Sequence, residues 1–248
     1  MRISGNTIFI PGATSGIGLG LALRLADSGN RVIIAGRRVE LLDRITAEHP
    51  AIESVVLDMT DPDAVMRVSR DVQERWPELN VLIAMAGIMH PEDVRSAGFL
   101  TTAESIVTTN LLGPIRLIAA FTEFLQARPS ATIMTVSSGL AFVPLAVTPT
   151  YSATKAAINS FSEAIRVQLA STSVQVIELV PPAVRTALMG LEDDPNALPL
   201  DAFLDETMSL IEAHPDAHEI LVERVHFLRR AEIEGRYDDV LAMLAQTH

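Results

Sequence analysis

The chain has 248 residues, 48% hydrophobic and 20% charged, which predicts a domain with a large buried core and excludes a disordered chain. Its 31 acidic and 19 basic side chains give a net charge of −12, which argues against a nucleic-acid partner. Because the chain has no cysteine, disulfides, thiolate metal sites and a cysteine nucleophile are excluded. We see no signal peptide and no run of about 18 apolar residues, so we expect a cytoplasmic protein without a membrane partner.

Short runs rich in β-branched residues alternate with longer amphipathic stretches along the whole chain. The predicted strands lie near 6–11, 31–36, 53–58, 80–85, 131–137, 174–180 and 218–223. The predicted helices lie near 16–28, 39–48, 61–75, 101–127, 150–171, 200–213 and 236–246. This alternation favours an α/β fold with a doubly wound parallel sheet of seven strands in three layers, the Rossmann fold. No linker divides the chain, so we interpret residues 1–248 as one domain.

A glycine-rich turn follows the first predicted strand, with Gly12, Gly16 and Gly18 in the spacing G-x-x-x-G-x-G. Glycines let backbone N–H groups approach a pyrophosphate, and the helix that follows adds the positive end of its dipole. The spacing is not that of a P-loop, and in isolation it would be as consistent with a connection that binds nothing. The strand–turn–helix context favours a dinucleotide site. Its expected members are Gly12, Thr14, Ser15, Gly16, Ile17 and Gly18.

Two arginines, Arg37 and Arg38, follow the second predicted strand, where an NAD-binding fold usually has an acidic residue for the ribose 2′-hydroxyl. Arginine suits a 2′-phosphate, so NADP(H) is the expected cofactor; the alternative is that both arginines begin a solvated helix. After the third strand, Asp58 and Met59 are expected to meet the adenine, with the carboxylate accepting from its amino group. Alternatively, Asp58 begins a turn ahead of Asp61.

Lys155 is the only lysine among the 19 basic residues. A surface position accepts lysine or arginine, so this position is expected to need an ammonium group. Tyr151 lies four residues earlier, on the same helix face. The ammonium and an oxidised nicotinamide are expected to lower the pKa of the phenol, while Ser138 bonds the substrate oxygen. The alternative is a core tyrosine that happens to precede a surface lysine.

Taken together, these motifs resemble the short-chain dehydrogenase/reductase family across nearly the whole chain. The resemblance rests on the glycine-rich turn, Ala86-Gly87, Asn110, Ser138, Tyr151-x-x-x-Lys155 and the turn at 181–186. The segment 110–114 and the double proline at 181–182 are similar to the DltE-like branch of that family.

The resemblance implies an enzyme that moves hydride between NADP(H) and a small to medium apolar ketone, aldehyde or alcohol, without a metal ion. Tyr151 would be the general acid in reduction, and Ser138 would orient the carbonyl. Lys155 would hold the nicotinamide ribose and lower the pKa of the tyrosine, and Asn110 would position a water that links it to solvent. The resemblance also implies cofactor contacts from Ala86, Gly87, Tyr151, Lys155, Pro181, Val184 and Thr186.

The residues give an independent reason for the role of Asn110. Pro114 lies inside the helix predicted over 101–127 and has no N–H, so the carbonyl of Asn110 loses its helical partner. A kinked helix with that carbonyl free would suit a bound water. The alternative is a kink that serves packing alone.

Three departures from the family pattern are Pro11, Ala84-Met85 and Pro182, where the family usually has Thr, two Asn and Gly. We expect apolar packing to replace a polar contact between the first two sites. These changes could weaken cofactor binding, so a non-catalytic NADP-binding regulator is an alternative function. An NAD-dependent dehydrogenase is a further alternative.

The substrate side is predicted to be a mainly apolar pocket walled by residues 88–90, 140–143 and 187–191. Residues 187–198 are interpreted as a short mobile lid, with a solvated acidic loop as the alternative. The resemblance implies a homodimer or homotetramer formed through the helices at 101–127 and 150–171. Residues 226–248 are predicted to add helix beyond the seventh strand.

Overall fold

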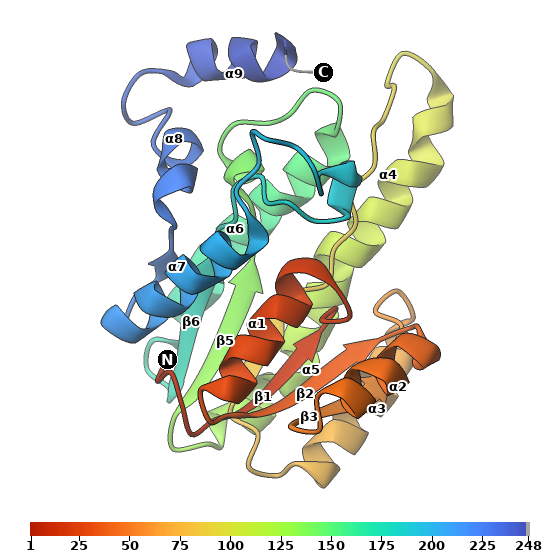
Figure 1. Cartoon of the computed structure of the whole chain (residues 1–248), viewed down its shortest axis with the longest axis vertical. Helices are drawn as coiled ribbons and strands as arrows, with labels where there is room; N and C mark the ends of the chain where they lie inside the picture. The colour runs from red at the N-terminus through yellow and green to blue at the C-terminus, as the bar shows by residue number, and fades with distance from the viewer. Residues whose placement is uncertain (247–248) are drawn as a thin grey trace.

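A computed structural model describes residues 1–246, and within them all the predicted strands are present in a single parallel sheet (Figure 1). The strands are β1 (Thr7–Pro11), β2 (Arg31–Gly36), β3 (Ile52–Val56), β4 (Val81–Ala84), β5 (Ala131–Val136), β6 (Val174–Leu179) and β7 (Glu219–Ile220). Their order is β3-β2-β1-β4-β5-β6-β7, which confirms the doubly wound Rossmann-type topology. The last strand is shorter than predicted because it pairs with β6 over two residues only.

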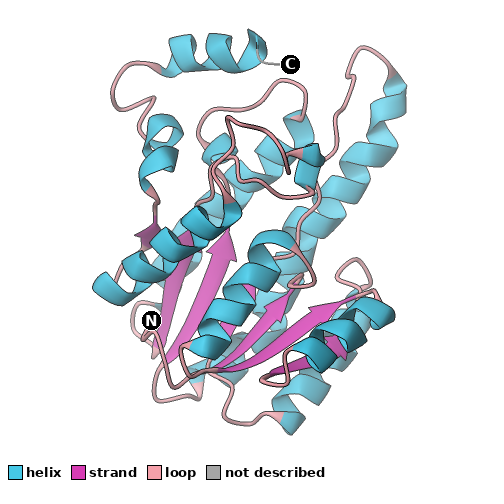
Figure 2. Ribbon diagram, in the orientation of Figure 1, coloured by secondary structure: helices cyan, strands magenta, loops and turns pink. Residues whose placement is uncertain are grey.

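Helices cover both faces of the sheet, as the α/β prediction requires, and the last two helices lie beyond its carboxyl end (Figure 2). They are α1 (Gly16–Asp27), α2 (Val39–Glu48), α3 (Pro62–Arg75), α4 (Leu100–Val107), α5 (Gly113–Gln126), α6 (Pro149–Leu169), α7 (Leu200–Ala213), α8 (His226–Arg229) and α9 (Tyr237–Gln246). One hydrophobic cluster joins α1, α2 and α7 to the sheet, and a second joins α3, α5 and α6. The three predicted layers are therefore observed.

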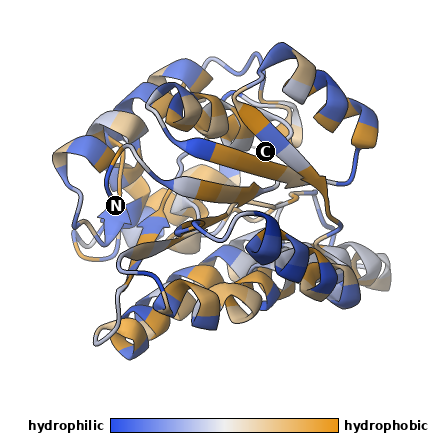
Figure 3. Ribbon diagram, turned by 90° about the horizontal axis from the view of Figure 1, so that it is seen from below, coloured by the Kyte–Doolittle hydropathy of each residue, from blue (hydrophilic) through white to orange (hydrophobic). Residues whose placement is uncertain are grey.

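The central strand β1 shows how the sheet divides the core. All five of its residues are buried, as expected for a parallel strand covered on both faces. Ile8 and Ile10 belong to the cluster under α1, whereas Phe9 faces the opposite cluster, where its ring lies 5.6 Å from that of Phe121. Figure 3 shows hydrophobic residues along the strands and on the helix sides that face them.

The helix predicted over 101–127 is interrupted at the place where Pro114 was expected to kink it. A π-helical segment, Thr108–Leu112, separates α4 from α5, and the N–H of Gly113 donates to the carbonyl of Thr108. Proline cannot donate to the helical ladder, so the wider turn accommodates the missing bond. The widened turn buries Asn110, which is 1% exposed.

By length and composition alone, one helical run in the described part of the chain, residues 97–126, could cross a membrane. The run contains charged residues such as Glu104 and Arg116, so it is not the uninterrupted apolar stretch whose absence was noted from the sequence. Leu117, Phe121 and Leu125 in this run are completely buried in the cluster against the sheet. Its apolar face therefore forms part of the protein core.

The added helix predicted beyond the seventh strand is present as α8 and α9, joined by a turn; residues 247–248 of that prediction lie outside the described residues. Val240 of α9 packs with Val143 and Ala231 in a small third cluster. Figure 1 shows α8 and α9 beyond the carboxyl ends of β5 and β6. The C-terminal segment therefore reaches the end of the sheet where ligands bind in this fold.

Candidate active site

The glycine-rich turn packs against the loop after β4 with no space for side chains. Gly12 has a φ of 89°, and a Cβ atom there would lie 2.6 Å from the Cα of Ala86. A Cβ atom at Gly18 would lie 2.8 Å from the carbonyl oxygen of Gly12. Helix α1 begins at Gly16, so its first N–H groups lie in this turn. Glycine is thus required sterically, and the bare backbone fits the pyrophosphate of a dinucleotide.

A cavity of about 490 Å³ extends from this turn to the residues predicted to be catalytic. Most of the predicted site residues line it. They are Gly12, Ser15, Gly16, Ile17, Gly18, Gly87, Ser138, Tyr151, Lys155, Pro181, Val184 and Thr186. The tertiary structure therefore brings the ends of β1, β4, β5 and β6 together around a single space, as the topology predicts.

A second cavity, of about 470 Å³, lies between α1 and α2 on the other side of the turn. Thr14 and Arg38 line it, and the Arg38 guanidinium donates to the Thr14 hydroxyl at 3.1 Å. Ser15 and Gly16 border both cavities. A ligand that follows the turn could therefore extend from one cavity to the other, with Arg38 at its far end.

Some of the predicted cofactor residues line neither cavity: they are Arg37, Asp58, Met59 and Ala86. Asp58 accepts hydrogen bonds from the N–H and the hydroxyl of Thr60, at 2.9 and 2.7 Å. Burial alone would raise the pKa of Asp58, but these bonds and the Arg37 charge outweigh it and hold the pKa below its usual value. The turn proposed as the alternative role of Asp58 is confirmed, and its contact with adenine stays a prediction.

Tyr151 and Lys155 face each other, as their spacing on one helix predicts. The Lys155 ammonium nitrogen lies 5.5 Å from the centre of the Tyr151 ring, and it donates to the carbonyl of Val136 on β5 at 2.8 Å. The two residues are 7% and 5% exposed. The alternative of a surface lysine beside a core tyrosine is therefore wrong.

The start of α6, which carries this pair, is fixed from a distant loop. Glu92 accepts from the N–H of Thr150 at 2.9 Å and from its hydroxyl at 2.7 Å. A carboxylate at a helix N-terminus satisfies a free N–H group and complements the helix dipole. Glu92 therefore positions the residue that precedes Tyr151. A lone glutamate in a loop gave no sequence signal for this role.

The expected lowering of the Tyr151 pKa by Lys155 is not observed in the protein alone. Burial raises the pKa of Tyr151 to about 12, and a hydrogen bond with Ser138 opposes this only in part. Burial also lowers the pKa of Lys155 to about 8, against the charge of Glu178. Desolvation is the largest cause of both shifts because both groups are deeply buried, and the lowering expected with an oxidised nicotinamide bound stays a prediction.

Ser138 lies two residues beyond the end of β5 and immediately before the short helical turn Gly139–Ala141. Its hydroxyl oxygen accepts from the N–H of Leu140 at 3.2 Å, and its hydrogen bond with Tyr151 places the two hydroxyls together. Both residues line the larger cavity. A substrate oxygen could therefore meet both hydroxyls at once.

The Asn110 side chain holds the loop after β4 instead of lining the cavity. It accepts from the N–H of Ile88 and donates to the carbonyl of the same residue, both at 2.8 Å. A Cβ atom at Gly87 would lie 3.6 Å from Asn110 Oδ1 and 3.7 Å from Lys155 Nζ. Asn110 therefore fixes the segment that separates it from Lys155, and the relay water stays a prediction.

The departures from the family pattern lie where apolar packing was expected. The β1–β4 register pairs Phe9 with Leu82, and its continuation places Pro11 opposite Ala84. A Cβ atom at Gly18 would lie 3.1 Å from Cγ of Met85, so the methionine packs under the turn. Pro182 lines the cavity beside the site.

Beyond the predicted catalytic residues, the larger cavity has mostly apolar walls. Its apolar side chains include Met85, Met89, Leu140, Leu145, Leu188, Met189, Leu191, Leu228 and Leu244. The charged residues in the lining are Lys155 and Asp194. Ile88, His90 and residues 141–143 were predicted to wall the pocket, but they do not line it. Leu145, just beyond the predicted segment 140–143, was missed in the sequence. Leu228 and Leu244 were also missed, because only the fold brings α8 and α9 to the site.

The segment 187–198 forms a closed loop over this cavity. Val184 pairs with Leu198 in an isolated bridge, and the Arg185 side chain donates to the Asp194 carbonyl at 2.9 Å. Met189 has a φ of 61°, in the left-handed region. These contacts close the loop at its base, and the predicted mobility of the lid stays a prediction.

Comparison with known proteins agrees with this site. The sequence family described as short chain dehydrogenase matches residues 6–196. The uncharacterized oxidoreductase DltE of Bacillus subtilis (strain 168) is 42% identical over 191 residues, covering 76% of this chain and 75% of that protein. An NADPH-dependent 1-acyldihydroxyacetone phosphate reductase of Schizosaccharomyces pombe is 31% identical over 183 residues, covering 73% of this chain and 60% of that protein.

Solved structures share the fold along almost the whole chain. The crystal structure of a short chain dehydrogenase from Burkholderia cenocepacia J2315 in complex with NADP superimposes with a TM-score of 0.83 and is 26% identical. The match covers 98% of this chain and 99% of that chain. The same fold also occurs in a complex with NAD, so the fold by itself does not choose the cofactor.

The cradle of glycines, the buried tyrosine–lysine pair and these matches define an oxidoreductase with a fold that binds nicotinamide cofactors. The chain belongs to the short-chain dehydrogenase family, in its DltE-like branch.

Proposed function

We propose that this protein transfers hydride between NADP(H) and a small to medium apolar ketone, aldehyde or alcohol. The observation that carries the proposal is the pairing of Tyr151 and Lys155, both buried, in a cavity that continues to the glycine-rich turn. A phenol and an ammonium at the end of a dinucleotide cradle suit proton transfer to a carbonyl that accepts hydride. The nicotinamide group supplies or accepts the hydride when the cofactor is bound.

Tyr151 has the protonation state that reduction needs. Burial raises the pKa of Tyr151 to about 12, so its hydroxyl carries a proton at neutral pH and can donate it to the substrate oxygen. Ser138 shares a hydrogen bond with this hydroxyl and can donate to the same oxygen as negative charge develops on it. The two hydroxyls thus both orient the carbonyl and stabilise its charge.

Lys155 makes the loss of that proton less costly. A phenolate in a buried site is stabilised by a positive charge nearby, and the ammonium nitrogen lies 5.5 Å from the Tyr151 ring centre. The bond to the Val136 carbonyl fixes the ammonium on the side of the cavity that the cofactor ribose would share. The ammonium would also hold that ribose.

The preference for NADP(H) is supported by the charges around the second cavity. Arg38 borders it and bonds Thr14 of the glycine-rich turn, and Arg37 lies next to it at the end of β2. No acidic residue occupies the end of β2, where it would bind a 2′-hydroxyl and repel a 2′-phosphate. The arginines instead offer charge-assisted bonds to a phosphate.

The apolar walls support a substrate without a negative charge. Leucine and methionine side chains form most of the cavity beyond Ser138 and Tyr151. Asp194 is the acidic residue in this lining, and its charge would oppose a carboxylate or phosphate on the substrate. Hydrophobic burial would supply the binding energy for an apolar substrate.

The test is NADPH oxidation by the wild type and by Tyr151→Phe across a panel of apolar ketones and aldehydes. We expect the wild type to turn over part of the panel and the variant to lose a factor on the order of 10² to 10⁴ in kcat. NADPH binding should be unchanged in the variant, measured by fluorescence titration. A wild-type rate no higher than that of the variant on every substrate would instead support a non-catalytic NADP-binding regulator.

Cofactor choice has a separate test with Arg37→Asp and Arg38→Asp. We expect both variants to bind NADPH more weakly, by roughly tenfold or more, and to bind NADH no worse than the wild type. The matched control is Arg67→Asp on the exposed side of α3, which makes the same change of charge away from both cavities. Unchanged NADPH affinity in both arginine variants would support the NAD-dependent alternative.

A further inference from the structure

A fully buried carboxylate lies behind the proposed site and has no part in the proposed chemistry. Glu178 stands near the end of β6 and is 0% exposed. Its N–H donates to the carbonyl of His218 at 2.9 Å, beside β7. Glutamate is rarely buried completely unless its charge is compensated, because an isolated buried carboxylate is very unfavourable. Glu178 therefore needs partners inside the protein.

The direct partners of Glu178 are neutral. The side-chain amide of Asn159 donates to its two carboxylate oxygens at 3.0 and 3.2 Å. The hydroxyl of Ser137 also lies beside the carboxylate and, with Asn159, lowers its pKa, although burial raises it overall. These groups orient the carboxylate and stabilise its charged form, but they leave the negative charge unbalanced.

One charge that this carboxylate acts on is the ammonium of Lys155. Asn159 follows Lys155 by one turn of α6, so their side chains project from the same face of the helix toward β5 and β6. Lys155 donates to Val136 of β5, and the β5–β6 register places Val136 opposite Leu179, the neighbour of Glu178. The Glu178 carboxylate faces α6 through Asn159, so it lies on the side of the sheet that carries Lys155, and its charge acts on the ammonium.

The other charges around Glu178 come from α6, β7 and α8. Glu219 lies opposite it on β7, and Arg229 of α8 binds Glu219 at 2.9 and 3.1 Å. Arg166 of α6 favours the charged form of Glu178, whereas Glu219 opposes it. Glu163 of α6 also acts on Arg229. Arg229 bonds Glu219 directly and also interacts with the charge of Glu178. Of the cations that interact with Glu178, Lys155 is the one that lines the larger cavity.

We propose that Glu178 is a positioning residue: its carboxylate, held by Asn159 behind the site, keeps Lys155 in the ammonium form beside Tyr151. The inference rests on the proposed function, in which this ammonium assists the phenol. Without a nearby negative charge, a lysine buried to this degree would give up its proton more readily. Glu178 would thus act on the reaction through Lys155 and without touching the substrate.

The single lysine allows a direct test. Full-length protein made with lysine labelled with ¹⁵N at Nζ gives one side-chain signal, and its pH titration reports the pKa of Lys155 alone. Glu178→Gln keeps the shape and an acceptor for Asn159 but removes the charge. We expect the pKa of Lys155 to fall by about one pH unit in this variant, with or without NADP. The alkaline limb of the kcat profile should move to lower pH by the same amount.

The matched control is Glu219→Gln, which removes a carboxylate from the adjacent strand. Because Arg229 already binds Glu219, and because Glu219 disfavours the charge on Glu178, the pKa of Lys155 should stay unchanged or rise slightly. A fall in Glu219→Gln equal to that in Glu178→Gln would contradict a specific role for Glu178.

An unchanged Lys155 titration in a folded Glu178→Gln variant would overturn the inference. If that variant does not fold, Asn159→Ala provides the test, because it leaves the carboxylate without its donors and favours its neutral form. The pKa of Lys155 should then fall as well, and an unchanged value would again overturn the inference. If the pKa of Lys155 does not fall in Glu178→Gln while the wild type turns over its substrates normally, only this inference is refuted. If the pKa falls as expected but the wild type turns over no substrate, the proposed function is refuted.

Discussion

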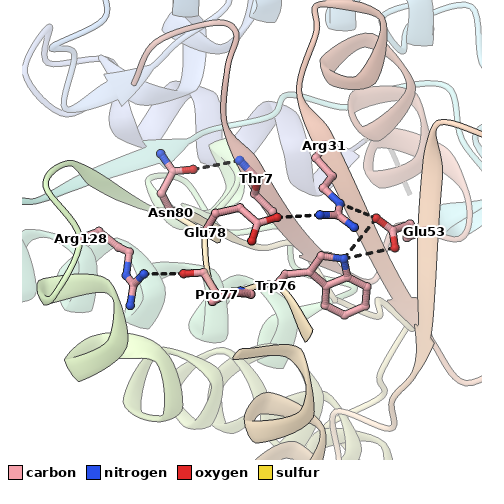
Figure 4. Close-up of polar contacts among 8 residues, drawn as sticks. All are labelled: Thr7, Arg31, Glu53, Trp76, Pro77, Glu78, Asn80 and Arg128. Atoms are coloured by element: carbon pink, nitrogen blue, oxygen red, sulfur yellow. Dashed lines mark hydrogen bonds and ion pairs between the residues drawn. The ribbon is translucent and has the colours of Figure 1, made fainter. Parts of the chain in front are cut away.

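The charged side chains at the two ends of the parallel sheet differ in their exposure to water. At the amino ends, Arg31 binds both Glu53 and Glu78 at 2.6 Å, and the three side chains are 48%, 38% and 49% exposed (Figure 4). At the carboxyl ends, Lys155 and Glu178 are 5% and 0% exposed. Water screens the first group, so its ion pairs contribute little, whereas burial makes each charge in the second group strong.

The polar residues at the amino ends, labelled in Figure 4, connect neighbouring secondary-structure elements. They do not line either cavity. Figure 4 shows the indole N–H of Trp76 donating to Glu53 and the side chain of Arg128 donating to the carbonyl of Pro77. The N–H of Thr7 donates to the Asn80 side chain at 3.0 Å in the same region. These bonds tie the segment after α3 to β1, β2, β3 and the turn that follows α5. Charged and polar residues thus connect secondary-structure elements at the amino ends and surround the candidate active site at the carboxyl ends.

Exchange of the two basic residue types should have unequal effects at the two ends. We expect Lys155→Arg to lower kcat/KM by a factor on the order of 10², because a broad guanidinium cannot replace a compact ammonium between the Val136 carbonyl and Tyr151. The measurement is steady-state NADPH oxidation with a substrate from the panel.

The matched control for this exchange is Arg31→Lys at the amino end. It should leave kcat/KM unchanged and alter the free energy of unfolding by less than about 1 kcal/mol, because the site is half exposed. Near-normal turnover in Lys155→Arg would remove the distinction between the two ends.

A pair of glycine substitutions tests the same contrast for the backbone. Gly12 and Gly29 have φ values of 89° and 85°, but only Gly12 has neighbours within 4 Å of an added Cβ atom. We expect Gly12→Ala to cost about 2 to 4 kcal/mol of stability and to weaken NADPH binding by roughly tenfold or more. Gly29→Ala should cost about 1 kcal/mol, from backbone strain alone.

Urea unfolding and fluorescence titration with NADPH would measure both effects. Equal losses of NADPH affinity in the two glycine variants would show that strain, and not contact with Ala86, limits the turn. A Gly12→Ala variant with normal NADPH affinity would contradict the hypothesis that the glycine-rich turn binds the cofactor.

The smallest expected effect comes from Glu78→Gln. This change removes one of the two carboxylates that bind Arg31, and the other, on Glu53, remains at 2.6 Å. We expect a loss below about 0.5 kcal/mol that shrinks further in high salt, because exposed pairs are screened. Urea unfolding at two salt concentrations would measure it. A loss above 2 kcal/mol would show that the amino end depends on its ion pairs as strongly as the carboxyl end.

Local sequence patterns predicted much of the candidate active site. The spacing of Tyr151 and Lys155 placed them on one face of a helix, and the glycines of the first turn marked the cradle. Pro114 marked the distortion beside Asn110, which the structure shows as a π-helical turn. Each of these signals lies within a few residues of the feature it predicts, so no knowledge of distant contacts was needed.

Other features depended on contacts between segments far apart in the sequence. Leu228 and Leu244 line the larger cavity because α8 and α9 lie beyond the carboxyl ends of β5 and β6. Glu92 caps the helix of Tyr151 from a loop 58 residues away in the chain. No periodicity or spacing encodes such contacts, because they depend on how the loops close.

The sequence by itself determined the order of strands and helices, the glycine cradle and the tyrosine–lysine pair, because hydrophobic period, steric need and helical spacing are local properties. Only the tertiary structure decided the depth of burial around the pair. In the protein alone, that burial raises the pKa of Tyr151 and lowers that of Lys155, against the charge of Glu178. Desolvation depends on everything packed around a group, so the electrostatics of the site belong to the fold.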